Sequence, residues 1–292
     1  MKIVDGAATR NGLSYPIVPR DAWLEIVAAA YQGQHDPRVP TCVLPGFPPD
    51  ELQIATTGHA GRATLVEAHT FYVDCAETFE RLGRPLKRAS MVLDFGVGWG
   101  RVGRFFLNDI APENLIGIDV DHKLVTICRS LFSASQFEVC SSHPPTGLAS
   151  RSLDFVVGYS VFSHLSEAAC IAWMCEFRRL LRPGGIAALT TRGRWFLDYC
   201  ASLRGTATDG YARGLSTLFS DFEATTARYD SGELVFSTNS DVAGGVRDSS
   251  FYGETFIPES YAARAFPDMK LAEFQFEAGH HTHPIMFFIR QG

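Results

Sequence analysis

The sequence predicts a doubly wound α/β fold. From Met91 onward, short apolar runs typical of buried parallel strands alternate with segments of helical periodicity, which is the pattern of βαβ units. A Pro-Gly-Gly sequence at 183–185 ends one of the expected helices before the next strand. The expected strands span 91–96, 114–120, 137–139, 153–160, 186–191, 270–278 and 284–290. The expected helices of this region span about 100–108, 123–132 and 166–181.

Two further segments are expected to be additions to a single α/β domain at 90–292. Residues 1–89 predict an N-terminal helical cap, with helices over about 21–31 and 62–82. The Pro-rich stretch between these helices cannot form a regular helix or a central strand. Residues 192–268 are rich in Gly, Ser, Thr and aromatic residues and are too long for a plain connection. We therefore expect an insertion over the ligand site.

Composition narrows the class of protein. A chain with 46% hydrophobic and 20% charged residues has the balance of an ordinary globular protein. The net charge of -6 and the lack of a dense Lys/Arg run argue against nucleic acid as a partner. No apolar run approaches the roughly 18 to 20 residues of a membrane span, and the N-terminus lacks the apolar core of a signal peptide. The seven scattered cysteines, without a C-x-x-C pair, predict reduced thiols and a cytoplasmic location.

Residues 92–101 read VLDFGVGWGR and carry most of the functional information. A strand ends there, and Gly96, Gly98 and Gly100 predict a tight turn before a helix. The missing side chains let a ligand approach the backbone, and a helix N-terminus offers unpaired N–H groups and a positive dipole end. Asp119 lies nineteen residues after Gly100 and ends the second strand, where a carboxylate can accept both hydroxyls of a ribose.

Two kinds of ligand compete for this turn. Residues 98–103 match the dinucleotide fingerprint G-x-G-x-x-G, with an acid at about the right distance, as in a nicotinamide-dependent oxidoreductase. Asp94 favours another ligand, because an acid beside a pyrophosphate would repel it. The same acid could hold the ammonium group of S-adenosylmethionine, directly or through water.

Four motifs follow one another along the chain, VLDFGVGWGR, IGIDVD, LDFVVGYSVFSHL and LLRPGG. In order and spacing they resemble the successive motifs of class I S-adenosylmethionine-dependent methyltransferases, over about residues 90–191. The resemblance implies a Rossmann-like domain with a mostly parallel seven-stranded sheet and an antiparallel C-terminal edge strand. It also implies methyl transfer as the activity, S-adenosylmethionine as the cofactor and S-adenosylhomocysteine as its product.

The resemblance assigns roles by position. It places Asp94 and the three glycines around the methionine moiety, Asp119 at the ribose and Val120 beside the adenine or ribose. The family often has an acid after the third strand that accepts the adenine amino group, whereas this chain has Ser141 and Ser142 there, so we expect a weaker hydroxyl contact. The full expected cofactor set is Asp94, Phe95, Gly96, Gly98, Gly100, Arg101, Asp119, Val120, Ser141, Ser142, Tyr159 and Ser160.

The chemistry itself demands few residues. Methyl transfer is an in-line displacement, for which the protein aligns the nucleophile, excludes water and deprotonates a hydroxyl or ammonium acceptor. His164, just beyond the fourth strand, is the candidate general base, and packing or a bond to a backbone carbonyl is the alternative. Phe162, Arg192 and Arg194 are the candidate acceptor-binding residues. A guanidinium could hold a carboxylate or phosphate on the acceptor, and an ordinary surface ion pair is the alternative for both arginines.

Two further groups of residues leave alternatives open. His280, His281 and His283 could present two imidazoles to a metal, but no third ligand at a recognisable spacing accompanies them, so no metal is expected. A set of aromatic residues in the insertion either lines an apolar acceptor site or forms the insertion's own core: Trp195, Phe196, Tyr211, Phe251 and Tyr252.

The sequence therefore predicts an enzyme that methylates O or N of a small molecule. An NAD(P)-dependent oxidoreductase and a non-catalytic S-adenosylmethionine-binding protein are the alternatives. The identity of the acceptor and the oligomeric state stay open, and the cap and the insertion are the segments that could form a homo-oligomer interface.

Overall fold

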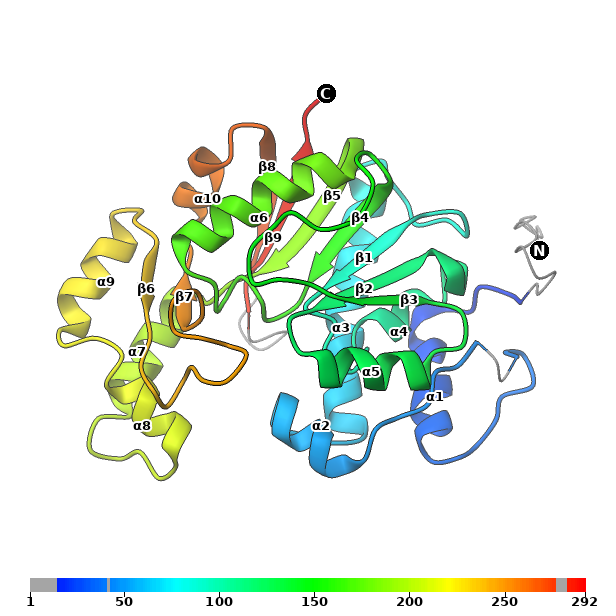
Figure 1. Cartoon of the computed structure of the whole chain (residues 1–292), viewed down its shortest axis with the longest axis horizontal. Helices are drawn as coiled ribbons and strands as arrows, with labels where there is room; N and C mark the ends of the chain where they lie inside the picture. The colour runs from blue at the N-terminus through cyan, green and yellow to red at the C-terminus, as the bar shows by residue number, and fades with distance from the viewer. Residues whose placement is uncertain (1–14, 41–42, 277–282) are drawn as a thin grey trace. The chain divides into compact units, whose positions relative to one another are not determined.

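A computed structural model of the 292-residue chain describes residues 15–40, 43–276 and 283–292. Its main sheet has seven strands in the order β3-β2-β1-β4-β5-β9-β8 (Figure 1). The C-terminal strand β9 runs antiparallel to both of its neighbours, β5 and β8, so the hairpin of β8 and β9 forms one edge of the sheet. This confirms the predicted fold. The chain divides into two compact units, Met1–Val139 and Cys140–Gly292, which are described in turn.

The first unit contains three parallel strands. They are β1 (Val92–Phe95), β2 (Leu115–Asp119) and β3 (Gln136–Val139), with β2 in the middle. All residues of β1 and β2 are buried, as expected for short apolar runs inside a parallel sheet. Helix α5 (His122–Leu131) packs against β2 and β3, and the carboxylate of Asp121 caps it by accepting the N–H of Lys123 at 2.9 Å.

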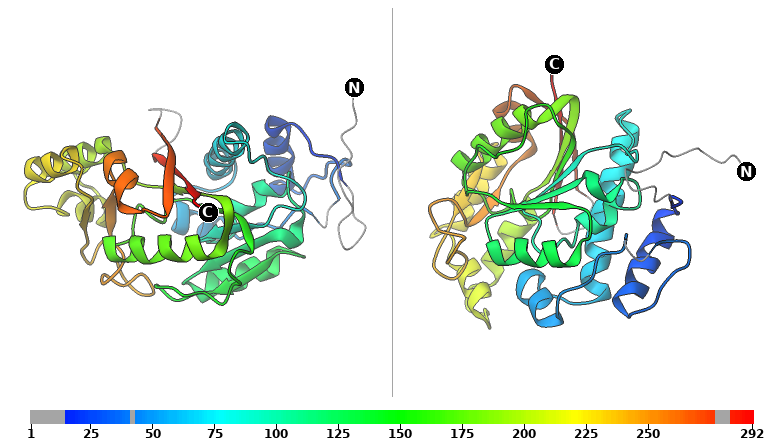
Figure 2. Two further views of the ribbon diagram at one scale, coloured as in Figure 1. Left: turned by 90° about the horizontal axis from the view of Figure 1, so that it is seen from above. Right: turned by 45° about the vertical axis from the view of Figure 1, so that its right-hand side comes forward.

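The N-terminal part of this unit is helical, as predicted. Helices α1 (Arg20–Tyr31) and α3 (Arg62–Arg81) pack side by side (Figure 2). A further helix, α2 (Asp50–Thr57), was not predicted; it starts directly after the Pro-rich stretch, with two acids in its first turn. The indole of Trp23 donates to the carbonyl of Phe105 at 3.0 Å and so joins α1 to α4 (Gly103–Phe106).

The second unit contains the other four strands of the main sheet. Strand β4 (Leu153–Gly158) is parallel to β5 (Leu181–Thr190), and β8 (Met269–Gln275) and β9 (Ile285–Arg290) follow at the edge. Helix α6 (Glu167–Leu180) packs on β5. Strand β5 begins five residues earlier than expected, because the Pro-Gly-Gly segment is accommodated as an irregularity in its pairing with β4.

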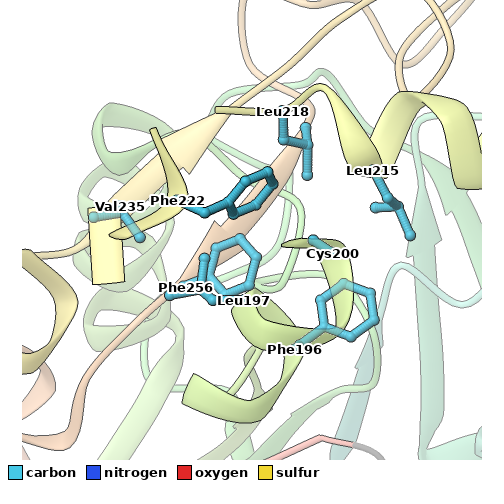
Figure 3. Packing of buried hydrophobic residues seen from close by; sticks show 8 residues of the cluster. All are labelled: Phe196, Leu197, Cys200, Leu215, Leu218, Phe222, Val235 and Phe256. Carbon is cyan, nitrogen blue, oxygen red and sulfur yellow. The ribbon is translucent and has the colours of Figure 1, made fainter. Parts of the chain in front are cut away.

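The segment expected to be an insertion contains four helices and a small sheet. Its helices are α7 (Arg194–Ser202), α8 (Gly210–Ser216), α9 (Phe222–Asp230) and α10 (Glu259–Ala265). Strands β6 (Val235–Ser237) and β7 (Glu254–Phe256) pair antiparallel. Figure 3 shows the core of this segment, in which Phe196, Leu197 and Phe256 pack together with residues of α8, α9 and β6. Phe196 therefore belongs to the insertion's own core, one of the two alternatives for the aromatic residues.

Within the described ranges, no helix combines the length and apolar content that crossing a membrane requires. The expected division into a cap at 1–89 and a domain at 90–292 stays a prediction.

Candidate functional site

The glycine-rich turn follows β1 directly. Gly96, Gly98 and Gly100 have φ values of 72°, 56° and 79°, a left-handed backbone that glycine adopts without steric cost. The N–H groups of Gly96 and Val97 both donate to the carbonyl of Ile118, at 2.9 and 3.0 Å. The turn is therefore held against the end of β2. Helix α4 begins three residues later than expected, because Gly100 is not helical.

The glycines of the turn serve different purposes. A Cβ on Gly100 would lie 2.4 Å from the ring of Phe132, so this glycine is needed for packing. A Cβ on Gly98 would have no described atom within 4 Å, so the backbone at Gly98 borders open space. A ligand can approach the backbone there. The contact of these glycines with a cofactor stays a prediction.

A buried arginine, Arg104, holds the backbone of the turn through a hydrogen bond. The Arg104 guanidinium donates through Nε to the carbonyl of Gly100 at 3.1 Å and through Nη2 to the carbonyl of Gly46 at 3.2 Å. It lies over the rings of Phe47 and Trp99, at 4.2 and 4.9 Å from their centroids. Burial lowers the pKa of Arg104 to about 9. Arg101 donates to Glu67 of α3 at 2.5 Å, and its expected role at the cofactor stays a prediction.

Asp94 is a buried carboxyl group within the same turn. Oδ2 of Asp94 accepts the N–H of Gly103 at 2.9 Å, and Asp94 is only 2% exposed. The pKa of Asp94 is raised to about 7, chiefly by burial. The hydrogen bond from Gly103 offsets only part of this rise, and the negative charge of Asp119 adds to it. A cationic group beside Asp94 would favour its ionised form. The carboxyl therefore suits an ammonium ligand and opposes a phosphate.

Asp119 ends β2 and is fixed by two backbone donors. Its Oδ2 accepts the N–H of Gly98 at 2.9 Å, and its Oδ1 accepts the N–H of Asp121 at 2.9 Å. A carboxylate oxygen has more than one lone pair, so each oxygen of Asp119 can also accept a hydroxyl hydrogen. This arrangement fits a ribose that presents two adjacent hydroxyls. Phe95 lies buried in β1, and Val120 follows Asp119 in a half-buried position.

The expected cofactor residues of the second unit have mixed surroundings. Ser141 is exposed, and the carbonyl of Ser142 accepts the indole N–H of Trp173 at 3.0 Å. Tyr159 is buried and meets the ring of His283 edge to face, with centroids 5.3 Å apart. Phe162, expected at the acceptor, is fully buried and lies 6.0 Å from the ring of Phe177. These roles stay predictions.

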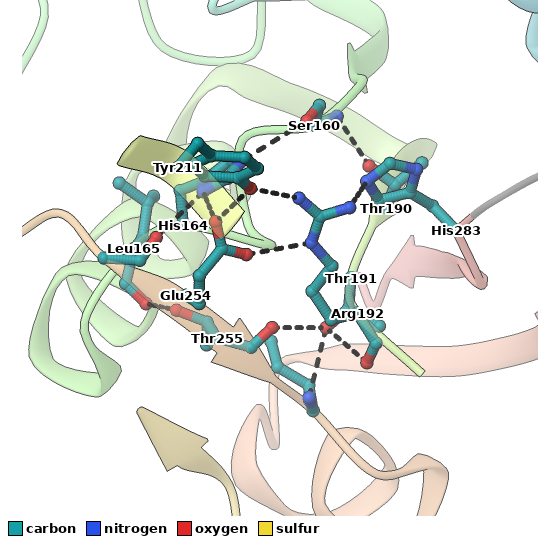
Figure 4. A network of polar contacts seen from close by, with 12 residues as sticks. Ser160, His164, Leu165, Thr190, Thr191, Arg192, Tyr211, Glu254, Thr255 and His283 are labelled. Carbon is teal, nitrogen blue, oxygen red and sulfur yellow. Dashed lines mark hydrogen bonds and ion pairs between the residues drawn. The ribbon is translucent and has the colours of Figure 1, made fainter. Parts of the chain in front are cut away.

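A buried polar network lies in the second unit (Figure 4). We define it by six residues from five segments of the chain: Ser160, His164, Arg192, Tyr211, Glu254 and His283. Glu254 is its centre, because Oε2 accepts Nε of Arg192 at 2.9 Å and Oε1 accepts the hydroxyl of Tyr211 at 2.7 Å. Burial raises the pKa of Glu254, but His164, Arg192 and Tyr211 outweigh burial and hold it at about 2. Glu254 is therefore ionised at neutral pH.

His164 carries its proton on a defined nitrogen. Its Nδ1 lies 2.8 Å from the carbonyl oxygen of Gly253, and since a carbonyl only accepts, Nδ1 must donate. In the neutral ring Nε2 is then an acceptor, and it lies 3.3 Å from Oγ of Ser160. The ring of Tyr252 is stacked on the imidazole at 4.9 Å between centroids. The carbonyl bond foreseen as the alternative for His164 is present, and it leaves Nε2 as the basic nitrogen.

The two candidate arginines differ in their surroundings. Arg192 is buried, and besides Glu254 it donates to Nε2 of His283 at 2.8 Å. Arg194 is half-buried, with a side chain that is 41% exposed, and it pairs with Asp198 of its own helix and with Asp230 of α9. Arg194 therefore makes the surface ion pair foreseen as the alternative, whereas the ion pair of Arg192 is buried. Their roles toward an acceptor stay predictions.

No sequence pattern indicates that Glu254 and Tyr211 belong to this network. Glu254 stands in a short strand 62 residues after its partner Arg192, and Tyr211 lies 43 residues before Glu254. Among the described residues no group of three His, Cys, Asp or Glu side chains could hold a metal ion. His280 and His281 lie outside the described residues, and Nε2 of His283 already accepts from Arg192.

A family model described as a methyltransferase domain matches residues 92–185. Over this segment the chain is similar to methyltransferase domains. It includes the glycine-rich turn, Asp119 and His164, and its match confirms the resemblance to class I S-adenosylmethionine-dependent methyltransferases.

Individual relatives are distant. A curated malonyl-[acyl-carrier protein] O-methyltransferase from Marinomonas sp. is 28% identical over 112 residues, which are 37% of this chain. The aligned part spans only 40% of that relative's length. Among solved structures, a Burkholderia thailandensis 1,6-didemethyltoxoflavin-N1-methyltransferase with S-adenosylhomocysteine is similar at 14% identity and a TM-score of 0.48, over 96% of this chain and 94% of the other. A magnesium protoporphyrin IX methyltransferase from Synechocystis is similar at 13% identity and a TM-score of 0.48, over 82% of this chain and 94% of the other.

Proposed function

We propose that this protein is an S-adenosylmethionine-dependent methyltransferase that transfers a methyl group to O or N of a small molecule. The observation that carries the proposal is the pairing of Asp119 with the open backbone at Gly98. A fixed carboxylate and an accessible glycine turn stand together at the end of two neighbouring parallel strands. This is where a doubly wound sheet binds a nucleoside.

The residues of the turn fit the proposed cofactor. Asp119 would hold the ribose hydroxyls, and Asp94 would hold the ammonium of the methionine part. The buried carboxyl of Asp94 supports this ligand over a dinucleotide, whose pyrophosphate would repel it. The bound cofactor supplies a methyl group on a sulfonium, which is already a good leaving group.

The chain's own contribution to the chemistry is a base. His164 has Nε2 as its acceptor nitrogen, and its Nδ1 is held by the carbonyl of Gly253. Such a fixed imidazole can take a proton from a hydroxyl or an N–H group of the acceptor. His164 is only 7% exposed, and its ring is stacked on that of Tyr252. Both features limit the contact of the imidazole with water.

The proposal is tested by calorimetric titration of the full chain with S-adenosylhomocysteine. Asp119→Ala should weaken binding at least about tenfold, because two hydroxyl contacts to a charged acceptor are lost. Glu138→Gln is the matched control, since it removes an exposed acid from neighbouring β3. Equal affinity in the Asp119 variant, or no binding by the natural chain, would overturn the cofactor site proposed here.

A further inference from the structure

We propose that the methyl acceptor is a neutral group that carries a proton, a hydroxyl or an N–H, and that Glu254 positions His164 to receive this proton through Ser160. The inference rests on the proposed methyl transfer and goes further, because it names the class of acceptor and two additional residues. It is carried by the buried polar network, whose contacts all lie within the second unit.

The first argument is the direction of the hydrogen bonds (Figure 4). Nδ1 of His164 donates to Gly253, so in the neutral imidazole Nε2 accepts from the hydroxyl of Ser160. The hydroxyl of Ser160 therefore directs its hydrogen to the imidazole and keeps its lone pairs for another donor. A group that donates an O–H or N–H hydrogen can occupy that position, whereas a carboxylate cannot.

The second argument is the charge that surrounds the imidazole. Oε1 of Glu254 lies 3.4 Å from Nδ1 of His164 and would stabilise the imidazolium formed by proton uptake. The other described groups of the network that face this pair are the guanidinium of Arg192, the hydroxyl of Tyr211 and the ring of Tyr252. Arg192 is neutralised by the same carboxylate, and both tyrosines are uncharged at neutral pH.

The neutralised arginine also bears on the acceptor. A guanidinium that binds an anionic acceptor is expected to have no carboxylate partner within the protein. Arg192, however, donates to the carboxylate of Glu254 at 2.9 Å and to His283 at 2.8 Å. The charges of Arg192 and Glu254 cancel each other. The network therefore offers a base and no net positive charge, which suits a neutral protic acceptor.

The third argument is the backbone of Ser160. Its φ of 58° is left-handed, which costs free energy for a residue other than glycine. The N–H of Ser160 donates to Oγ1 of Thr190 at 2.7 Å, which holds this conformation. The hydroxyl is thus fixed in place at the end of β4, as a proton relay requires.

The reaction then balances as follows. A lone pair of the acceptor O or N forms the new bond to the methyl carbon, and the electrons of the broken carbon–sulfur bond stay on sulfur. The acceptor proton moves to Oγ of Ser160 while the Ser160 proton moves to Nε2 of His164. The imidazolium afterwards releases this proton to water, so the chain returns to its starting state.

One test uses the free protein. Nitrogen-15 NMR of labelled histidine side chains reports which ring nitrogen carries the proton. We expect His164 to be protonated on Nδ1 at neutral pH, and Ser160→Ala to shift only the Nε2 resonance. A His164 protonated on Nε2 would overturn the relay.

The second test separates positioning from folding. Glu254→Gln should lower kcat roughly 100-fold and leave KM and the affinity for S-adenosylhomocysteine unchanged. The double variant Arg192→Gln/Glu254→Gln removes the unpaired charge that the single variant leaves. If Glu254 only balances Arg192, the double variant regains activity, and the positioning role is wrong.

The third test concerns the acceptor class. Release of S-adenosylhomocysteine is measured with a panel of phenols and N–H heterocycles and with their aryl carboxylate counterparts. We expect turnover only with the protic, neutral members, and turnover with the carboxylates alone would overturn the inference. If S-adenosylhomocysteine fails to bind, the proposed function itself fails; if it binds and Glu254→Gln keeps full kcat, only this inference fails.

Discussion

Replacing Asp94 by Asn should stabilise the free protein at neutral pH. Asn keeps an oxygen that can accept the N–H of Gly103, which Asp94 now accepts at 2.9 Å, but it removes the charge. The pKa of Asp94 is about 7 in the folded chain against an ordinary 3.8, with burial as the largest cause. The difference of about 3 units corresponds to about 4 kcal/mol, at 1.36 kcal/mol per unit.

The sign of the effect follows from the raised pKa. Below the ordinary value near 3.8, Asp94 is neutral in both the folded and the unfolded chain, so its full contribution to stability is present. As the pH rises toward 7, the unfolded chain ionises first, and this contribution is progressively lost. The advantage of Asp94→Asn should therefore be near zero at about pH 4 and approach about 4 kcal/mol at about pH 8.

Urea titrations at a series of pH values give the required free energies of unfolding. Subtracting the natural chain from the variant removes the contribution of every other titrating group. Glu138→Gln, which replaces an exposed acid of β3, serves as the control for the substitution itself. A pH-independent difference for Asp94→Asn, or a variant less stable than the natural chain at about pH 8, would refute the reasoning.

Three further predictions concern the turn, the arginines and the histidine. Gly100→Ala should lower the free energy of unfolding by more than Gly98→Ala does. Both glycines have a positive φ, but only at Gly100 would the new Cβ lie 2.4 Å from a ring, that of Phe132. Equal losses in thermal or urea unfolding would contradict this prediction. Arg192→Met should lower the free energy of unfolding by about 3 kcal/mol or more, because it leaves the buried carboxylate of Glu254 without its guanidinium partner. Arg194→Met should lower it by less than about 1 kcal/mol. The reverse order of the two losses would show that burial does not set the contribution of these ion pairs. Zinc or a chelator should leave the melting temperature unchanged, because Nε2 of His283 accepts from Arg192, and a shift of several degrees would reveal a metal site.

Much of the fold was predictable because periodicity and the order of motifs report local structure. The apolar runs gave all seven strands of the main sheet, and Gly96, Gly98 and Gly100 do have the backbone expected for the turn. The insertion was harder. Its strands β6 and β7 have only three residues each, and its helices α8 and α10 have seven, too short for a clear helical pattern.

The chemistry of the second unit was less predictable for a different reason. His164 and Arg192 stand near recognisable motifs, but Glu254 reaches them only through the folded chain. Sequence could not show that Arg192 would be neutralised, or which ring nitrogen of His164 would be free. Such long-range pairs follow from tertiary packing, which no local pattern records.

The central claim is that the glycine-rich turn binds S-adenosylmethionine and not a dinucleotide. Calorimetric titration of the full chain with S-adenosylhomocysteine and, separately, with NADH tests this claim most directly. We predict binding of S-adenosylhomocysteine in the micromolar range, about -8 kcal/mol, with no measurable heat from NADH. Tight binding of NADH without binding of S-adenosylhomocysteine would contradict the account.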